Sequence, residues 1–168
     1  MPFPRASLAA FLLLAGCSTG SNAPEPALEL TGRVVDQADI FDDAFEARLT
    51  SQLARLEDEK QVQFVVASTS SLNGHVIEEY SINLARAWSL GDVDRNDGLL
   101  LLVAPNERQV RIEVGIGLVE DIKDEEAATI IQRDILPRFR SGDFESGVKN
   151  GVDGLIREVT PELLKEAA

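Results

Sequence analysis

Leu99-Leu100-Leu101-Leu102-Val103-Ala104 is an uninterrupted apolar run, and the segment Pro105-Asn106-Glu107-Arg108 follows it directly. A short apolar run without polar positions is typical of a strand that is buried on both faces, so we place it at the centre of a sheet. In Gln109–Val114 apolar and polar residues alternate, which predicts a second strand with one buried face. A proline and three polar residues between the two runs predict a turn, so the two strands should form an antiparallel hairpin.

Two helices and one strand are predicted before this hairpin. Apolar residues recur at helical spacing in residues 45–56 and 77–88, and the β-branched run Val62–Ala67 between them predicts a buried strand. Asp43, with a glutamate three residues later, resembles a capping box at the start of the first helix. Gly91 can end the second helix, because glycine readily adopts the left-handed conformation.

Two further helices are predicted after the hairpin. The pattern in residues 124–135 predicts a helix that Pro137 stops, and residues 144–159 predict the last long helix. A parallel connection between strands needs a crossover helix, whereas a hairpin does not. The order of elements therefore predicts an α/β fold, an α/β/α sandwich whose mixed, mostly parallel sheet ends in an antiparallel hairpin.

Acidic residues are concentrated in two loops that this topology brings to one edge of the sheet. The loop before the central strand contains Asp92, Asp94, Asn96 and Asp97. The strand that ends at Val114 returns to the same edge, so we expect Glu120 and Asp121 to approach that loop. Carboxylates gathered at one edge need a cation or abundant water. Asp36, which follows the extended pair Val34-Val35, is a candidate further ligand.

The acidic loop resembles a calcium-binding loop without matching one. Oxygen-bearing side chains occupy its first, third and fifth positions from Asp92, as in an EF-hand. The sixth and twelfth positions, which should be glycine and glutamate, are Asp97 and Val103. Two interpretations stay open, a hard-cation site of another geometry and a solvated acidic turn.

The charge balance restricts the classes of partner. The chain has 16 Lys and Arg against 29 Asp and Glu, a net charge of -13. Such a surface repels phosphate backbones, so we expect no nucleic-acid partner, and metal cations are the natural small ligands. An acidic balance can also serve solubility alone.

The first residues are typical of a secretory signal. Arg5 precedes the apolar run Leu8–Leu14, and Ala15-Gly16 stands directly before Cys17, the only cysteine of the chain. Small residues before a cysteine favour a bacterial lipoprotein signal, with Cys17 as the lipidated first residue of the mature protein. The alternative is an ordinary signal peptide with a cysteine that has no such role.

The resulting organisation has four parts. We expect a signal peptide at residues 1–16, a flexible tether at 17–30, one domain at 31–160 and a C-terminal tail at 161–168. The protein would then be anchored outside the cytoplasm on the periplasmic side. Ser18, in the place of an aspartate retention signal, favours the outer membrane.

Several short motifs occur along the chain in an order that resembles one known family. They are Val34-Val35-Asp36, Leu72-Asn73-Gly74 before Ile77-Glu78-Glu79-Tyr80, Trp88-Ser89-Leu90-Gly91, Gly98 with Leu99–Leu102, and Arg111–Leu118. The chain thereby resembles the TPM domain proteins, which occur in the thylakoid lumen, among bacterial secreted proteins and among modulators of an acetylcholine receptor. The resemblance covers Gly32 to about Val159 and implies an α/β/α sandwich.

The resemblance also implies several activities. Members of the family are described as calcium-binding modules, as acid phosphatases and as factors that assist membrane complexes. Carried over by motif, the metal ligands would be Asp36 and the pair Asn96-Asp97, with Glu113 or Asp94 nearby.

This chain departs from the family pattern at two points. The family usually has Asp-Asn before Gly98, and here the order is Asn96-Asp97. Val119 stands where the family often has glutamate. Both departures concern the expected ligand set.

The residues that hydrolysis usually needs are few in this sequence. His75 is the only histidine, and we expect it at the surface of a loop. The sequence contains no Cys-x5-Arg motif and no Walker-type glycine loop. We therefore expect a membrane-tethered, calcium-binding accessory module that supports or binds membrane-protein complexes. The alternative is a metal-dependent acid phosphatase that acts on phosphate monoesters.

Overall fold

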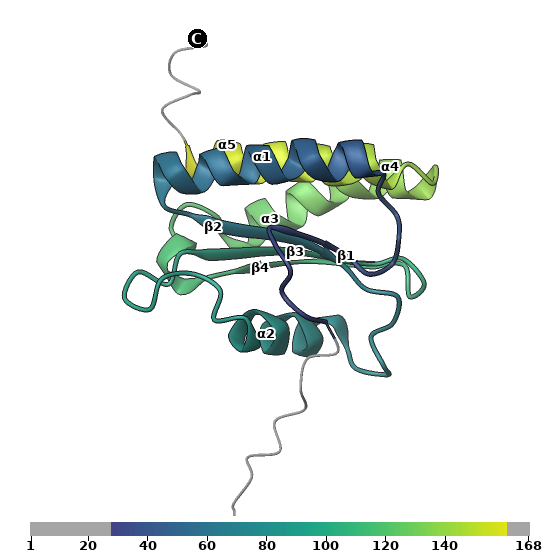
Figure 1. Cartoon of the computed structure of the whole chain (residues 1–168), viewed down its shortest axis with the longest axis horizontal. Helices are drawn as coiled ribbons and strands as arrows, with labels where there is room; N and C mark the ends of the chain where they lie inside the picture. Colours follow the sequence, from purple (N-terminus) through teal and green to yellow (C-terminus); the bar gives the residue numbers. More distant parts are fainter. Residues whose placement is uncertain (1–27, 161–168) are drawn as a thin grey trace, which may run out of the picture.

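Helices cover both faces of a four-stranded sheet in the computed structural model, which describes residues 28–160 (Figure 1). The strands are β1 (Val34–Asp36), β2 (Gln63–Ser68), β3 (Gly98–Ala104) and β4 (Gln109–Val114), and they lie in that order. The first three are parallel, and β4 is antiparallel to β3. The α/β/α sandwich with a mixed, mostly parallel sheet and a final hairpin is confirmed.

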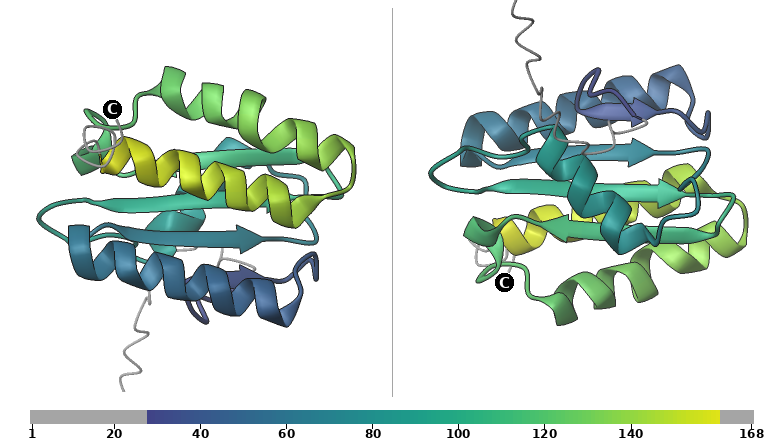
Figure 2. Two further views of the ribbon diagram at one scale, coloured as in Figure 1. Left: turned by 90° about the horizontal axis from the view of Figure 1, so that it is seen from above. Right: turned by 90° about the horizontal axis from the view of Figure 1, so that it is seen from below.

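The side chains of β3 alternate between two apolar layers, which is why every residue of this strand is buried. Leu101 packs in the layer beneath α1 (Asp43–Lys60) and α5 (Phe144–Val159). Leu102 packs in the layer above α2 (Ile77–Ala87), on the other face. Figure 2 shows α5 between α1 and the segment that contains α3 and α4.

Two helix ends differ from the prediction. Asp42, not Asp43, caps α1, because its Oδ1 accepts the N–H of Phe45 at 2.6 Å. α2 ends at Ala87 rather than near Gly91, because Ser89 already has a left-handed φ of 49°. Adjacent residues of similar type can serve as caps, so periodicity predicts a helix better than its last residue.

The prediction that Pro137 stops a helix was wrong. α3 (Asp124–Ile130) passes through a π-helical turn, η2 (Ile131–Ile135), directly into α4 (Leu136–Arg140). In a regular α-helix the proline ring would clash with the carbonyl four residues earlier. Here a π-helical turn precedes it and Pro137 lies in the first turn of α4, where its missing N–H is tolerated.

The described chain begins with residues that pack on the domain. Leu28 is buried, and its carbonyl accepts the indole N–H of Trp88 at 3.1 Å. Leu30 packs against the same layer, although we expected both leucines in the tether. The expected signal peptide, the lipidated Cys17 and the tail 161–168 lie outside the described residues. Within residues 28–160, no helix is long and apolar enough to span a bilayer.

Candidate functional site

The loop Gly91–Asp97 and the turn after β4 lie against each other, as the topology predicted. The N–H of Gly115 donates to the carbonyl of Gly98 at 2.8 Å, and that of Gly117 donates to the carbonyl of Asn96 at 3.0 Å. A Cβ atom at Gly117 would overlap the carbonyl oxygen of Arg95. The two backbones therefore touch where only glycine fits, and these glycines are packing positions.

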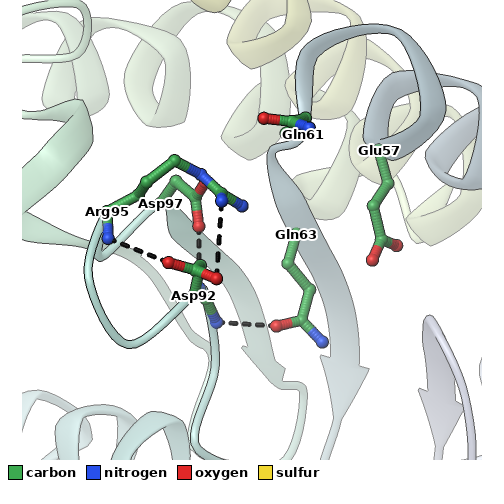
Figure 3. Close-up of a pocket in the computed structure, with 7 residues that line it drawn as sticks. Glu57, Gln61, Gln63, Asp92, Arg95 and Asp97 are labelled. Carbon is green, nitrogen blue, oxygen red and sulfur yellow. Dashed lines mark hydrogen bonds and ion pairs between the residues drawn. The ribbon is translucent and has the colours of Figure 1, made fainter.

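Two carboxylates of the loop are neutralised by an arginine of the same loop (Figure 3). Asp97 is buried, and its two oxygens accept the Asp92 N–H at 2.8 Å and Arg95 Nε at 2.5 Å. Asp92 accepts the N–H groups of Asp94 and Arg95 at 3.0 and 3.1 Å, and it lies 3.4 Å from Arg95 Nη1.

These contacts explain the direction of two pKa changes. Hydrogen bonds from the backbone N–H groups of Arg95 and Asp94 lower the pKa of Asp92. The hydrogen bond to Asp97 raises the pKa of Arg95 further above its usual value. Arg95 is thus the internal cation of the loop.

A polar pocket of about 370 Å³ lies between this loop and the C-terminal end of α1. Gln63 closes one side, because its side-chain oxygen accepts the Gly91 N–H at 2.6 Å. Glu57, from α1, is bound to Arg33 at 2.6 Å. Each of the three carboxylates that line this pocket, Glu57, Asp92 and Asp97, already has a basic partner.

A larger groove of about 620 Å³ lies on the α2 side of the loop. Glu113 of β4 lines it together with Asp92 and Asn96, so the structure brings Glu113 near the loop as the family pattern implied. Its carboxylate accepts the Ser81 hydroxyl at 3.0 Å and Arg111 Nε at 3.3 Å.

Asp36 does not join this group, and the prediction that placed it beside Asp97 was wrong. Asp36 lies opposite Ser68 at one end of β2, whereas Gly98, directly after the loop, lies opposite Gln63 at the other end. The two ends of β2 are roughly 16 Å apart. The residue after a strand and the loop before its parallel neighbour necessarily lie at opposite edges of the sheet.

The carboxylate of Asp36 has a structural role at its own edge. One oxygen accepts the N–H groups of Ile40 and Phe41, both at 2.8 Å, and the other accepts the Ser68 hydroxyl. These bonds hold the connection between β1 and α1.

The sequence-derived ligand set is therefore divided between two edges. Asp97 and Glu113 have internal partners, Asp94 is exposed and Asn96 lies along the groove, while Asp36 is remote. Within residues 28–160, no three Asp, Glu, His or Cys side chains are arranged to hold a metal ion.

Sequence reasoning missed the apolar side chains on the two touching loops. Val93 is 86% exposed, Ile116 74% and Val119 41%. Of the four large apolar side chains exposed in the described part of the chain, only Val76 lies elsewhere. A signal was present, because Val93 lies between aspartates and Ile116 between glycines, where no core position is expected.

Comparison with known proteins places this arrangement in a family. The family model for the TPM domain matches residues 34–158, which include both loops and all four strands. The chain belongs to the TPM domain family. The TPM domain resembles the solution structure of the N-terminal domain of a protein from P. gingivalis, with 31% identity and a TM-score of 0.73. That match covers 79% of this chain and 85% of the other.

Two further solved structures share the fold at lower identity. The N-terminal domain of the cg2496 protein from Corynebacterium glutamicum has 16% identity and a TM-score of 0.58, over 91% of this chain and 87% of that one. The BA42 protein from Bizionia argentinensis has 15% identity and a TM-score of 0.63, over 72% and 82%. No curated protein matches the chain.

Proposed function

We propose that this TPM domain is an extracytoplasmic accessory module that is tethered to the membrane by a lipid on Cys17 and binds a membrane-protein partner. The binding site is the loop surface, formed by residues 91–97 and 115–121. The observation that carries the proposal is the exposure of Val93, Ile116 and Val119 on two loops whose backbones are bonded to each other. Apolar side chains gathered on a fixed frame are typical of interaction sites.

The loop surface has the features of a binding hot spot. Its backbone bonds exist before a partner arrives, so little ordering entropy is lost on binding. Burying Val93 and Ile116 in a partner's pocket would contribute about 1.5–3 kcal/mol each. Asp94, Glu120 and Asp121 are exposed beside them, so the complementary partner has an apolar pocket with Lys or Arg at its edge.

The proposed anchor at Cys17 would keep the domain close to the membrane, which favours a partner in or near the bilayer. Eleven peptide units join Cys17 to Leu28, and they span at most about 40 Å. Leu28 packs on Trp88, and the loop surface begins three residues after that tryptophan. A domain held in this way would reach segments of a membrane protein that lie close to the bilayer.

Calcium would compete with Arg95 for the carboxylates of the acidic loop. A divalent cation would take the Asp92 and Asp97 carboxylates after the guanidinium moves away, and Asp94 and Asn96 would add oxygens. Because this cage is not preformed, we expect a dissociation constant at the weak end, about 10⁻⁴–10⁻³ M. Asp36 is excluded from these calcium ligands, because it lies at the opposite edge of the sheet, and a metal-dependent phosphatase loses the same ligand.

The proposed binding site is tested by affinity capture from detergent-solubilised membranes of the source organism. The unchanged chain and Val76→Ser, which alters an exposed apolar residue outside the loop surface, should enrich the same membrane protein. The double variant Val93→Ser with Ile116→Ser should lose it. Retention by the double variant would show that the loop surface does not bind the partner.

The anchor and the ion are tested separately. Cys17→Ser should move the protein from the membrane fraction to the soluble fraction, and its persistence in the membrane fraction would contradict the anchor. Calorimetric titration with calcium should give tighter binding for Arg95→Gln than for the unchanged chain. Equal affinities would remove calcium from the proposal.

A further inference from the structure

We infer that a groove along α1 and α5 binds an acidic, amphipathic helix of a partner protein. This groove, of about 560 Å³, lies on the face of the sheet opposite α2. We call it the basic groove, because its charged lining consists of Arg48, Arg55 and Lys149. The remaining residues that line it are Phe45, Ala47, Leu49, Ser51 and Gln52.

The charge of the basic groove is opposite to that of the chain. Acidic residues outnumber basic ones by 29 to 16, yet no carboxylate lines this groove. Within the described residues, neither Arg48 nor Arg55 forms a hydrogen bond or an ion pair. Two arginines without partners in so acidic a protein leave their guanidinium groups available to an external carboxylate.

The third cation marks the border with α5. Lys149 Nζ lies 2.6 Å from an oxygen of Asp153, whose other oxygen accepts the Gln52 side-chain N–H at 2.8 Å. The Asp42 N–H also donates to Glu145 at 2.9 Å. The two pairs, Gln52 with Asp153 and Asp42 with Glu145, show that α1 and α5 run side by side in the same direction (Figure 2). The groove therefore lies along the paired helices α1 and α5.

The spacing of the arginines selects a helix as the occupant. Arg48 and Arg55 are seven residues apart, which is two turns or about 10.5 Å along α1. Glutamates at positions i and i+7 of a second helix have the same separation. Such a helix, laid along α1, would pair with both arginines and place its apolar residues over Ala47, which is exposed in the groove.

A membrane surface fits the groove less well than a protein helix. Leu28, from which the chain continues toward Cys17, packs on the α2 side of the sheet, whereas α1 and α5 cover the other side (Figure 1).

The inference is tested with a fluorescein-labelled helical peptide of 18 residues that has glutamates at positions i and i+7 and leucines between them. Its anisotropy is measured with the full chain in detergent. We expect saturable binding that weakens at least tenfold in Arg48→Glu with Arg55→Glu and also weakens with added salt. A matched peptide with lysines for glutamates should bind Arg48→Glu with Arg55→Glu more tightly than it binds the unchanged chain.

The matched control is Arg138→Glu with Arg140→Glu, which makes the same charge change on α4. This control should bind the acidic peptide as the unchanged chain does, and circular dichroism should show that both variants are folded. Equal weakening in the two variants would overturn the inference, because net charge alone would then explain binding. If Arg48→Glu with Arg55→Glu instead converts a sedimenting dimer into a monomer, the occupant is a second copy of this chain and the partner helix is ruled out.

Discussion

Replacing Gly117 by alanine should force the two halves of the loop surface apart. The new Cβ would overlap the Arg95 carbonyl oxygen and would stand 3.1 Å from both the Arg95 carbonyl carbon and the Asn96 carbonyl oxygen. All three atoms belong to backbone, so no side chain can rotate away, and the segments must separate by roughly an ångström. Overpacking of this kind costs about 1–3 kcal/mol. Weakening the 3.0 Å bond from the Gly117 N–H to Asn96 adds about 1 kcal/mol.

We therefore expect Gly117→Ala to lower the free energy of unfolding by about 2–4 kcal/mol. Urea unfolding followed by the fluorescence of Trp88, the only tryptophan, measures this change. Gly32→Ala is the matched control, because a Cβ there would lie 3.9 Å from its nearest neighbour, and its effect should stay within about 0.5 kcal/mol. If the two variants unfold at the same urea concentration, the loops are not held together as described, and the loop surface loses its fixed frame.

Four further changes test other parts of the structure. Asp42→Ala should lower the free energy of unfolding by about 1 kcal/mol in urea titrations, because it removes the side chain that caps α1. Burial, and then the charge of Asp36, raise the pKa of Glu46, so the native state holds this proton more tightly than the unfolded state. The associated stability is present below the unfolded pKa and is lost as pH rises through the raised one. Glu46→Gln should therefore be more stable than the unchanged chain at pH 7, because it removes the ionised carboxylate. The difference in unfolding free energy between the two should be smaller at pH 3.5, and urea titrations at both pH values measure it. Asp97→Asn should cost about 1–3 kcal/mol in urea, because it replaces the buried carboxylate that accepts the Asp92 N–H and Arg95 Nε by a neutral amide. Val93→Ser should change the unfolding free energy by less than about 0.5 kcal/mol, since the side chain is exposed.

The central part of the sheet was predictable because the pattern of apolar and polar residues within each strand indicates how that strand is buried. Leu99–Ala104 has no polar position, so a site with two apolar neighbours is the only place that buries all its side chains. The alternation in Gln109–Val114 and the short turn before it fix an antiparallel neighbour, and β4 is found there. The contact between the two loops of the candidate surface followed from this local pattern, because the return of β4 brings Gly115 and Gly117 to the loop before β3.

The place of Asp36 could not be predicted in the same way. β1 has only three residues, and the sequence Val34-Val35-Asp36 does not indicate which strand it pairs with or whether that pairing is parallel. An antiparallel β1 would carry Asp36 to the loop edge, whereas the observed parallel pairing carries it to the other edge. The position therefore depends on long-range pairing, which three apolar and acidic residues do not encode.

Whether the acidic loop needs an external cation depends on which side chains pair with its carboxylates, and not on the number of carboxylates. Counting carboxylates in Asp92–Asp97 favoured a cation, but Arg95 lies three residues after Asp92 and two before Asp97, close enough to neutralise both. That spacing was visible in the sequence. The folded loop was needed to show that one guanidinium reaches both side chains.

If the proposed lipid anchor is present, the contact between Trp88 and Leu28 would connect it to the proposed binding site. Tension along the N-terminal segment would be applied at the Leu28 carbonyl, and the indole that donates to it stands directly after the last turn of α2. From there the chain continues into the acidic loop, so a pull from the bilayer on the proposed anchor would act on the segment that we propose binds the partner. Because Trp88 is the only tryptophan of the chain, its fluorescence would report a change in its contact with Leu28 under such tension.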